Sequence, residues 1–121
     1  MSSPLQHEIL KALEKAENAL QNAEYDLKGG FILAAANRAY YACFYCMTAL
    51  LYTKNVCVKT HVGTKSKFSE LFIKSGIFPQ QTSDIITLLF DNRQEADYDL
   101  DADISLDEAK QLIKKAAKLC Y

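Results

Sequence analysis

The stretch that decides the fold is residues 31–54, FILAAANRAYYACFYCMTALLYTK. From Phe31 to Thr53 the only charged residue is Arg38, and apolar side chains recur on every side of a helix built from it. A helix that is apolar all round must be buried on most of its sides. The sequence therefore predicts a central helix over residues 31–54, covered by its own domain or by a partner chain.

Four further helices are predicted around this central one. Apolar residues recur in steps of three and four over residues 4–28, 64–74, 80–98 and 105–120. Only four Gly and two Pro occur in 121 residues, which argues against a sandwich or barrel and against disorder. Long helices with short connections predict an all-α fold, an antiparallel bundle of four to five helices, in one domain over residues 1–121.

Local signals mark the ends of the first and last of these helices. Ser3 and Gln6 have the spacing of a capping box, and Pro4 suits the first helical position. The glycine pair at 29–30 is expected to end the first helix. The Ser-x-x-Glu pattern at residues 105–108 predicts a second capping box, at the start of the last helix.

Composition narrows the class of protein. No apolar run reaches the ~18 residues of a membrane span, and the start MSSPLQHEIL has no signal-peptide pattern. The four cysteines are expected to be reduced, because 121 residues can form a core without disulfides, and this favours the cytoplasm. The net charge of −1 combines −7 over residues 91–108 with +6 elsewhere, which argues against broad, non-specific nucleic-acid binding.

The two arginines are the most unusual side chains of the chain. Arg93 follows Leu89 by one helical turn, so it continues an apolar stripe, where a charge must be paired or directed into a wet cavity. Asp97, four residues further on, is one partner that would neutralise it locally. Arg38, with Asn37 beside it, is the parallel case in the central helix. Because guanidinium groups bind phosphate oxygens bidentately, the two arginines suggest a shared anion or phosphate site.

Four tracts together carry a resemblance to a known family. They are NRAYYACFYCMTALL at 37–51, KTHVG at 59–63, RQEADYD at 93–99 and ISLDEAKQLIKKA at 104–116. In order and spacing they resemble the HEPN domain family over nearly the whole chain. The resemblance implies a small helical bundle that usually dimerises and is often a metal-independent ribonuclease without a cofactor. It also implies the toxin half of a toxin–antitoxin pair, whose partner is commonly a minimal nucleotidyltransferase.

The catalytic pattern of that family is an Arg followed four to six residues later by a His, contributed by both protomers of the dimer. Arg93 matches the Arg, and Tyr98 stands where the His is expected. A phenol with a pKa of about 10 is a poor general base at neutral pH, so Tyr98 does not replace the missing His as the base. The role predicted for Arg93 is therefore to contact a phosphate. The roles predicted for Tyr98 are to form a hydrogen bond, to stack on a base, or to be modified with a nucleotide by the partner. The RNA- or nucleotide-binding residues predicted beside them are Arg38, Asn37, Asn92, Asp97 and Lys59.

The segment before the third helix, residues 55–63, has no periodicity and holds the remaining catalytic candidate. His61 has a structural interpretation, in which it caps that helix or pairs with a carboxylate. It also has a catalytic one, in which it supplies the imidazole that the Arg93 motif lacks. Positive charges with no acid among them surround it, on Lys54, Lys59, Lys65 and Lys67. These lysines are either a solvated face or a group that steers phosphates towards the arginines.

A row of polar-tipped side chains follows the central helix at helical spacing. It comprises Tyr41, Tyr45, Thr48 and Tyr52. Stacking of nucleic-acid bases is one interpretation of the row, and a core or dimer seam is the favoured one. The same row supports one rival function, a non-catalytic nucleotide-binding or protein-interaction module whose partner-facing surface is this helix.

The other rival function is a calcium-binding helix–loop–helix protein. Residues 97–108 match a calcium loop at the ligand positions Asp97, Asp99, Asp101 and Glu108. The match fails at the sixth position, where Ala102 replaces the glycine of the sharp turn, and no metal site is predicted. Cys43 and Cys46 lack a second cysteine pair at zinc-ligand spacing, so ordinary packing is predicted for them.

Overall fold

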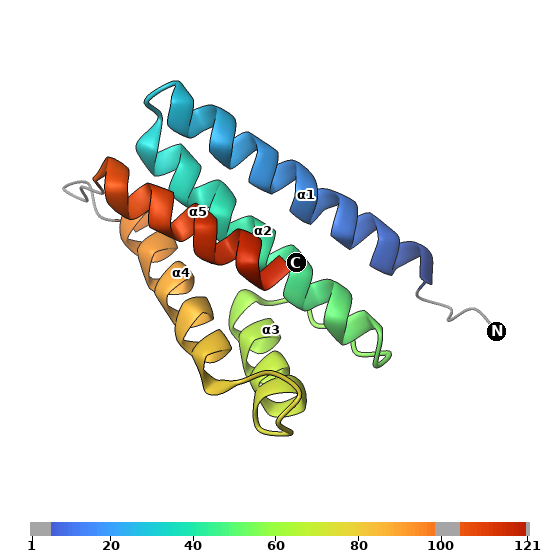
Figure 1. The fold of residues 1–121 in the computed structure, drawn as a ribbon. Helices are drawn as coiled ribbons and strands as arrows, with labels where there is room; N and C mark the ends of the chain where they lie inside the picture. The colour runs from blue at the N-terminus through green and yellow to red at the C-terminus, as the bar shows by residue number, and fades with distance from the viewer. Residues whose placement is uncertain (1–5, 99–104, 121) are drawn as a thin grey trace.

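The computed structural model describes residues 6–98 and 105–120, and within them the side chains of residues 6–91 and 105–118. These parts form five α-helices and one π-helical turn, and contain no strand (Figure 1). The elements are α1 Gln6–Lys28, α2 Ile32–Tyr52, α3 His61–Phe68, η1 Ser69–Ile73, α4 Gln80–Tyr98 and α5 Leu106–Cys120. The predicted all-α bundle is therefore confirmed. No helix in the described ranges is both long enough and apolar enough to cross a membrane.

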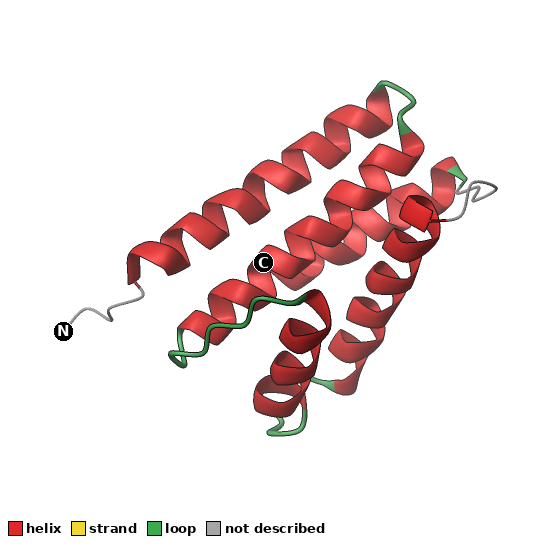
Figure 2. Ribbon diagram, turned by 180° about the vertical axis from the view of Figure 1, so that it is seen from behind, coloured by secondary structure: helices red, strands yellow, loops and turns green. Residues whose placement is uncertain are grey.

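Helix α2 lies at the centre of the bundle. α1 runs antiparallel beside it, and α3, α4 and α5 also contact it (Figures 1 and 2). The last turns of α4, the first turn of α5 and the first turns of α2 lie at the same end of the bundle. Ten residues of α2 are buried, so the predicted central helix is covered largely by helices of its own chain.

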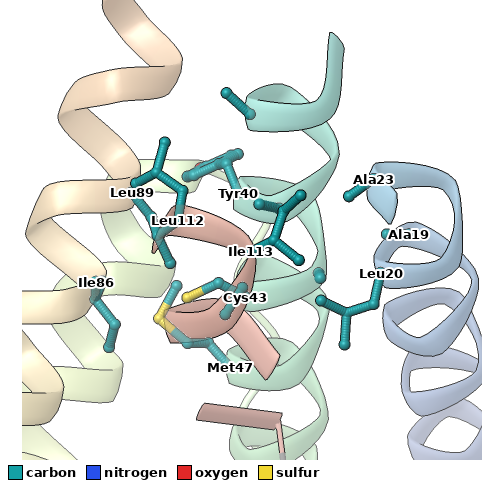
Figure 3. Close-up of a cluster of buried hydrophobic side chains, with 14 of the residues drawn as sticks. Ala19, Leu20, Ala23, Tyr40, Cys43, Met47, Ile86, Leu89, Leu112 and Ile113 are labelled. Carbon is teal, nitrogen blue, oxygen red and sulfur yellow. The ribbon is translucent and has the colours of Figure 1, made fainter. Parts of the chain in front are cut away.

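The side of α1 that faces α2 consists mostly of alanines. Four of the five buried residues of α1 are alanines, namely Ala12, Ala16, Ala19 and Ala23. Alanine carries only a methyl group, so the two helix backbones can pack closely without leaving voids. Figure 3 shows Ala19 and Ala23 directed from α1 towards α2.

On its other sides α2 meets larger side chains from α4 and α5. Tyr40, Cys43 and Met47 of α2 lie in one cluster with residues of both helices (Figure 3). The α4 and α5 members labelled there are Ile86, Leu89, Leu112 and Ile113. Because α2 contributes to both the alanine contact and this cluster, it joins the two sides of a single core.

The turn between α1 and α2 requires a glycine. Gly30 has a φ of 84°, in the left-handed region that favours glycine. Its N–H donates to the carbonyl of Leu27 at 3.1 Å, and the N–H of Phe31 donates to the carbonyl of Asp26 at 2.8 Å. This pair of bonds is a Schellman motif, which satisfies the last carbonyls of α1. The predicted end of the first helix at residues 29–30 is confirmed.

The third helix begins earlier than predicted. The sequence placed its start near residue 64, whereas α3 starts at His61. Thr60 has extended backbone angles, and its Oγ1 accepts a hydrogen bond from the N–H of Gly63 at 2.9 Å. Thr60 is thus the N-cap, and His61 lies in the first turn instead of capping the helix. After Phe68 the helix continues as the π-helical turn η1.

Capping at the start of α5 follows the prediction. The N–H of Glu108 donates to Oγ of Ser105 at 3.1 Å, the first half of the predicted capping box. Ser3 and Pro4, predicted to begin the first helix, lie outside the described residues.

Replacement of Leu89 should cost far more stability than replacement of its neighbour Leu88. Leu89 is 1% exposed and Leu88 is 38% exposed. We expect Leu89→Ala to lower the free energy of unfolding by about 3 kcal/mol through lost burial and a residual cavity. Leu88→Ala, the matched control, should cost less than about 1 kcal/mol. Urea denaturation followed by circular dichroism measures both, and equal losses would contradict the described packing of α4.

Candidate functional site

Arg38 lies half-buried on the first half of α2. Its Nη2 donates to Oδ1 of Asn37 at 2.9 Å, and its guanidinium carbon lies 4.8 Å from the ring centroid of Tyr41. The one ion pair among the described side chains joins Lys67 of α3 to Glu70 of η1, so no described carboxylate neutralises Arg38. A guanidinium held against an aromatic face, with further N–H groups to donate, is suited to bind an anion.

His61, in the first turn of α3, packs against the aromatic side chains of α2. Its Nδ1 shares a hydrogen bond of 2.5 Å with the hydroxyl of Tyr40. The imidazole stacks on Phe44, with 4.4 Å between centroids and 16° between planes, and it meets Tyr41 edge-on at 5.7 Å. These contacts fix the position and orientation of the half-buried imidazole.

Tyr41 connects the arginine to the histidine. Its ring face contacts Arg38, and its ring packs perpendicular to that of His61, so the structure brings Asn37, Arg38 and His61 into one group. We call Asn37, Arg38, Tyr40, Tyr41, Phe44 and His61 the Arg38–His61 cluster. Sequence reasoning included Tyr41 only in the row of tyrosines. The signal that could have found its role is its position three residues after Arg38, which puts both on one helix face.

Helix α4 reaches this cluster through Phe90. The rings of Phe90 and Tyr40 meet edge to face with 5.9 Å between centroids, and Nζ of Lys65 lies 5.1 Å from the Phe90 centroid. Arg93 follows Phe90 by one turn of the same helix. The side chains of Asn92, Arg93, Asp97 and Tyr98 lie outside the described residues, so the site roles assigned to them stay predictions.

The basic stretch of residues 54–67 does not form one surface. Lys54 lies over the ring of Phe72 at 5.5 Å, Lys65 lies over Phe90, and Lys67 pairs with Glu70. The exposed Lys59 lines a pocket beside the second half of α2. Of the four lysines, Lys65 is the one whose ammonium group lies against Phe90, the α4 residue that contacts the Arg38–His61 cluster.

No group of three or more His, Cys, Asp or Glu able to hold a metal ion occurs among the described residues. Of the segment considered as a calcium loop, Asp99, Asp101 and Ala102 lie outside the described residues, as does the side chain of Asp97. The backbone N–H of Glu108 takes part in helix capping, as described above.

The described cysteines differ sharply in their surroundings. Cys43 and Cys46 are buried in the core, Cys57 is exposed on the connection before α3, and all three are free thiols. Burial raises the pKa of the Cys43 thiol far above its ordinary range, and the nearby Cys46 raises it further. Both buried thiols are packing groups, as the sequence predicted.

Comparison with known proteins identifies the family. The model of the HEPN domain matches residues 9–120, from the first turns of α1 to the end of α5. The chain belongs to the HEPN family.

Three relatives of this HEPN domain agree with that result. Two proteins of Methanocaldococcus jannaschii are each named "Putative toxin". One is 37% identical over 108 residues, which cover 89% of this chain and 74% of the relative. The other is 33% identical over 116 residues, 96% of this chain and 86% of the relative. A UPF0332 protein of Thermotoga maritima is 30% identical over 102 residues, 84% of this chain and 77% of the relative.

Removal of the Tyr40 hydroxyl should destabilise this HEPN domain. Tyr40→Phe keeps the aromatic packing but takes away the hydroxyl that bonds Nδ1 of His61, so we expect a loss of about 1–3 kcal/mol in unfolding free energy. The matched control is Tyr25→Phe. Tyr25 is 77% exposed, so this change should alter stability by less than about 0.5 kcal/mol. Urea denaturation measures both, and equal stabilities would show that the hydrogen bond contributes nothing.

The described thiols should react in a fixed order. Brief labelling of the native protein with iodoacetamide at neutral pH should modify Cys57, with Cys43 and Cys46 reacting only after unfolding, because the thiolate is the reactive form. The pKa of the Cys43 thiol is higher in the folded protein than in the unfolded one. The stability that the buried, protonated thiol contributes is therefore complete below about pH 8.5 and is lost as the pH rises further. Mass spectrometry of the peptides reads the order, and early labelling of Cys43 would contradict the described core.

Proposed function

We propose that this protein is a toxin-like member of a toxin–antitoxin pair that binds RNA or nucleotide phosphates at the Arg38–His61 cluster and cleaves RNA without a metal ion. The observation that carries the proposal is the guanidinium of Arg38, held by Asn37 and Tyr41 without a described carboxylate partner. The toxin role is supported by the names of the two Methanocaldococcus jannaschii relatives.

The chemistry of the cluster suits a phosphate backbone next to an unpaired base. Arg38 uses one N–H on Asn37, which leaves other donors of the guanidinium for phosphate oxygens. Aromatic rings beside such a cation are the arrangement on which unpaired bases stack. Single-stranded RNA, whose bases are not already paired, is therefore the substrate class that we propose.

Cleavage without a metal ion needs a group that takes the proton of the attacking ribose 2′-hydroxyl and a group that stabilises the charged phosphate. In this proposal Arg93 contacts the phosphate that is cut, and the imidazole of His61 takes the proton. The 2′-oxygen then bonds to phosphorus and the 5′-oxygen leaves with a proton returned to it. Tyr98 hydrogen-bonds or stacks beside Arg93, or serves as the residue that a partner enzyme modifies.

Family resemblance supplies the rest of the proposal. The protein would act as a homodimer in the cytoplasm, with a minimal nucleotidyltransferase as its antitoxin partner. In that arrangement both protomers would contribute to each site, and modification of Tyr98 would add a phosphate-bearing group next to Arg93. Such a group would repel the phosphate of the RNA.

A non-catalytic interaction module is the second candidate, and one observation favours it. At the turn between α1 and α2, Tyr25 is 77% exposed, Phe31 64% and Leu33 41%. Large apolar side chains grouped on a surface mark contact sites for other proteins. This surface would serve binding to a partner even if the Arg38–His61 cluster performed no chemistry.

RNA cleavage in EDTA tests the catalytic proposal. Wild-type protein should cut a single-stranded RNA in EDTA, and Arg93→Ala should slow the cut at least about 100-fold, as expected for loss of a group that stabilises developing charge. His61→Ala should slow it by about 100-fold or more if His61 takes the proton. Lys28→Ala, a change at an exposed residue that belongs to neither the Arg38–His61 cluster nor the Arg93 motif, is the control. Absence of cleavage with undisturbed growth on overexpression would favour the interaction module.

RNA binding can be measured apart from cleavage. Arg38→Gln should weaken binding of a non-cleavable, 2′-deoxy-substituted strand by about tenfold, since a hydrogen bond to a charged group contributes about 1.5–3 kcal/mol. It should also make binding less sensitive to salt. Fluorescence anisotropy across a salt series reads both effects. An affinity equal to that of wild type would show that Arg38 does not contribute to RNA binding.

A further inference from the structure

A pocket of about 340 Å³ lies between the first half of α1, the second half of α2 and the connection before α3. Its lining includes Lys11 and Lys15 of α1, Tyr45 and Tyr52 of α2, and Lys59 of the connection. The Arg38–His61 cluster lies around the first half of α2, so the pocket extends along α2 away from the arginine. Phe44 is the one side chain that belongs to both.

The pocket carries an excess of positive charge. Three lysines line it against one acid, Glu8. None of the three lysines forms an ion pair with a described side chain. Lys11 and Lys15 lie four residues apart on one face of α1, where like charges repel each other. An anion bound between α1 and Lys59 would remove this repulsion, and it would be held from both sides.

The wall that α2 contributes is aromatic with polar tips. Nζ of Lys15 lies 5.7 Å from the ring centroid of Tyr45, so cation and ring already adjoin. Thr48 donates its hydroxyl to the carbonyl of Phe44 at 2.9 Å. The hydroxyls of Tyr45 and Tyr52 make no hydrogen bond to any described residue. These two phenols can therefore donate to a ligand.

We propose that this pocket binds one nucleotide unit, with its phosphate against the lysines and its base against the tyrosine rings. The volume is within the usual range for small-ligand sites, which begins at about 300 Å³. An inorganic phosphate alone would leave the aromatic wall unused, and an uncharged aromatic compound would leave the lysines unpaired. The unit can come from a free mononucleotide or from the end of an RNA strand.

The inference does not rest on the proposed cleavage. The pocket contains neither arginine, so a protein that fails to cut RNA can still bind a nucleotide there. The row from Tyr41 to Tyr52 on α2 nevertheless runs from the Arg38–His61 cluster to the pocket. A strand with its end in the pocket would therefore follow α2 towards Arg38.

Calorimetric titration of the full chain with AMP, adenosine and inorganic phosphate tests the pocket. We expect AMP to bind with a Kd below about 1 mM, and adenosine and phosphate each to bind at least about tenfold more weakly. Lys15→Met and Lys59→Met should each weaken AMP at least about tenfold, while Lys28→Met on the same helix α1 should change it less than about twofold. The AMP binding that is lost in Lys15→Met and Lys59→Met belongs to the pocket, whereas binding that is lost only in Arg38→Gln belongs to the Arg38–His61 cluster.

A short single-stranded RNA, with and without a 5′-phosphate, identifies the source of the nucleotide. If the 5′-phosphorylated strand binds more tightly than AMP and loses that advantage in Lys15→Met, the pocket holds an RNA end. If AMP binds more tightly than either strand, the pocket holds a free nucleotide. Circular dichroism confirms that each variant is folded. The proposal is overturned if AMP does not bind, if adenosine binds as tightly as AMP, or if both lysine variants bind AMP like wild type.

Discussion

Burial of α2 is the constraint on which the rest of the structure depends. A helix with one charge between Phe31 and Thr53 cannot be left in water, and each large apolar side chain removed from water contributes about 1.5–3 kcal/mol. One helix cannot cover it, because a single neighbour buries only one stripe. The chain therefore surrounds α2 with α1, α3, α4 and α5. The alanines of α1 allow the longest of these contacts to be close.

The cover over α2 is incomplete along one stripe, and both candidate sites lie there. Arg38, Tyr41, Tyr45, Thr48 and Tyr52 follow one another in steps of three and four residues, and all are half-buried. Such side chains can bury their apolar parts against neighbours and keep a polar group at the surface. His61 packs against the first half of the stripe, at Tyr41, and lysines lie beside the second half of the stripe. The packing of one apolar helix thus creates both a cation–aromatic cluster and a basic pocket.

Sequence reasoning succeeded where the controlling physics is local. The long helices follow from periodicity, and the glycine turn and the Ser105 cap follow from short-range hydrogen bonds. The start of α3 was wrong because Thr60 caps it without the acidic residue of a capping box. The bond between Tyr40 and His61 joins residues 21 positions apart, and the pocket around Lys59 draws on three segments. Spacing along the chain does not encode such distant pairings. The sequence therefore named Arg38 and His61 as candidates but missed the aromatic side chains that the structure packs between them.

The charged side chains around the two ends of α2 differ in sign, so an anion is repelled at one end and attracted at the other. At the end where α2 begins, α4 and α5 carry the exposed acids Asp91, Asp107 and Glu108, within the stretch that holds most of the negative charge. The pocket beside the second half of α2 has a positive excess. Over distances of about 8–10 Å in physiological salt, a phosphate is therefore drawn to the pocket and repelled from the acidic end. Binding at Arg38 must then come from short-range contacts, the hydrogen bonds and ring contacts of a correctly placed ligand, which makes that site selective for geometry instead of for negative charge alone.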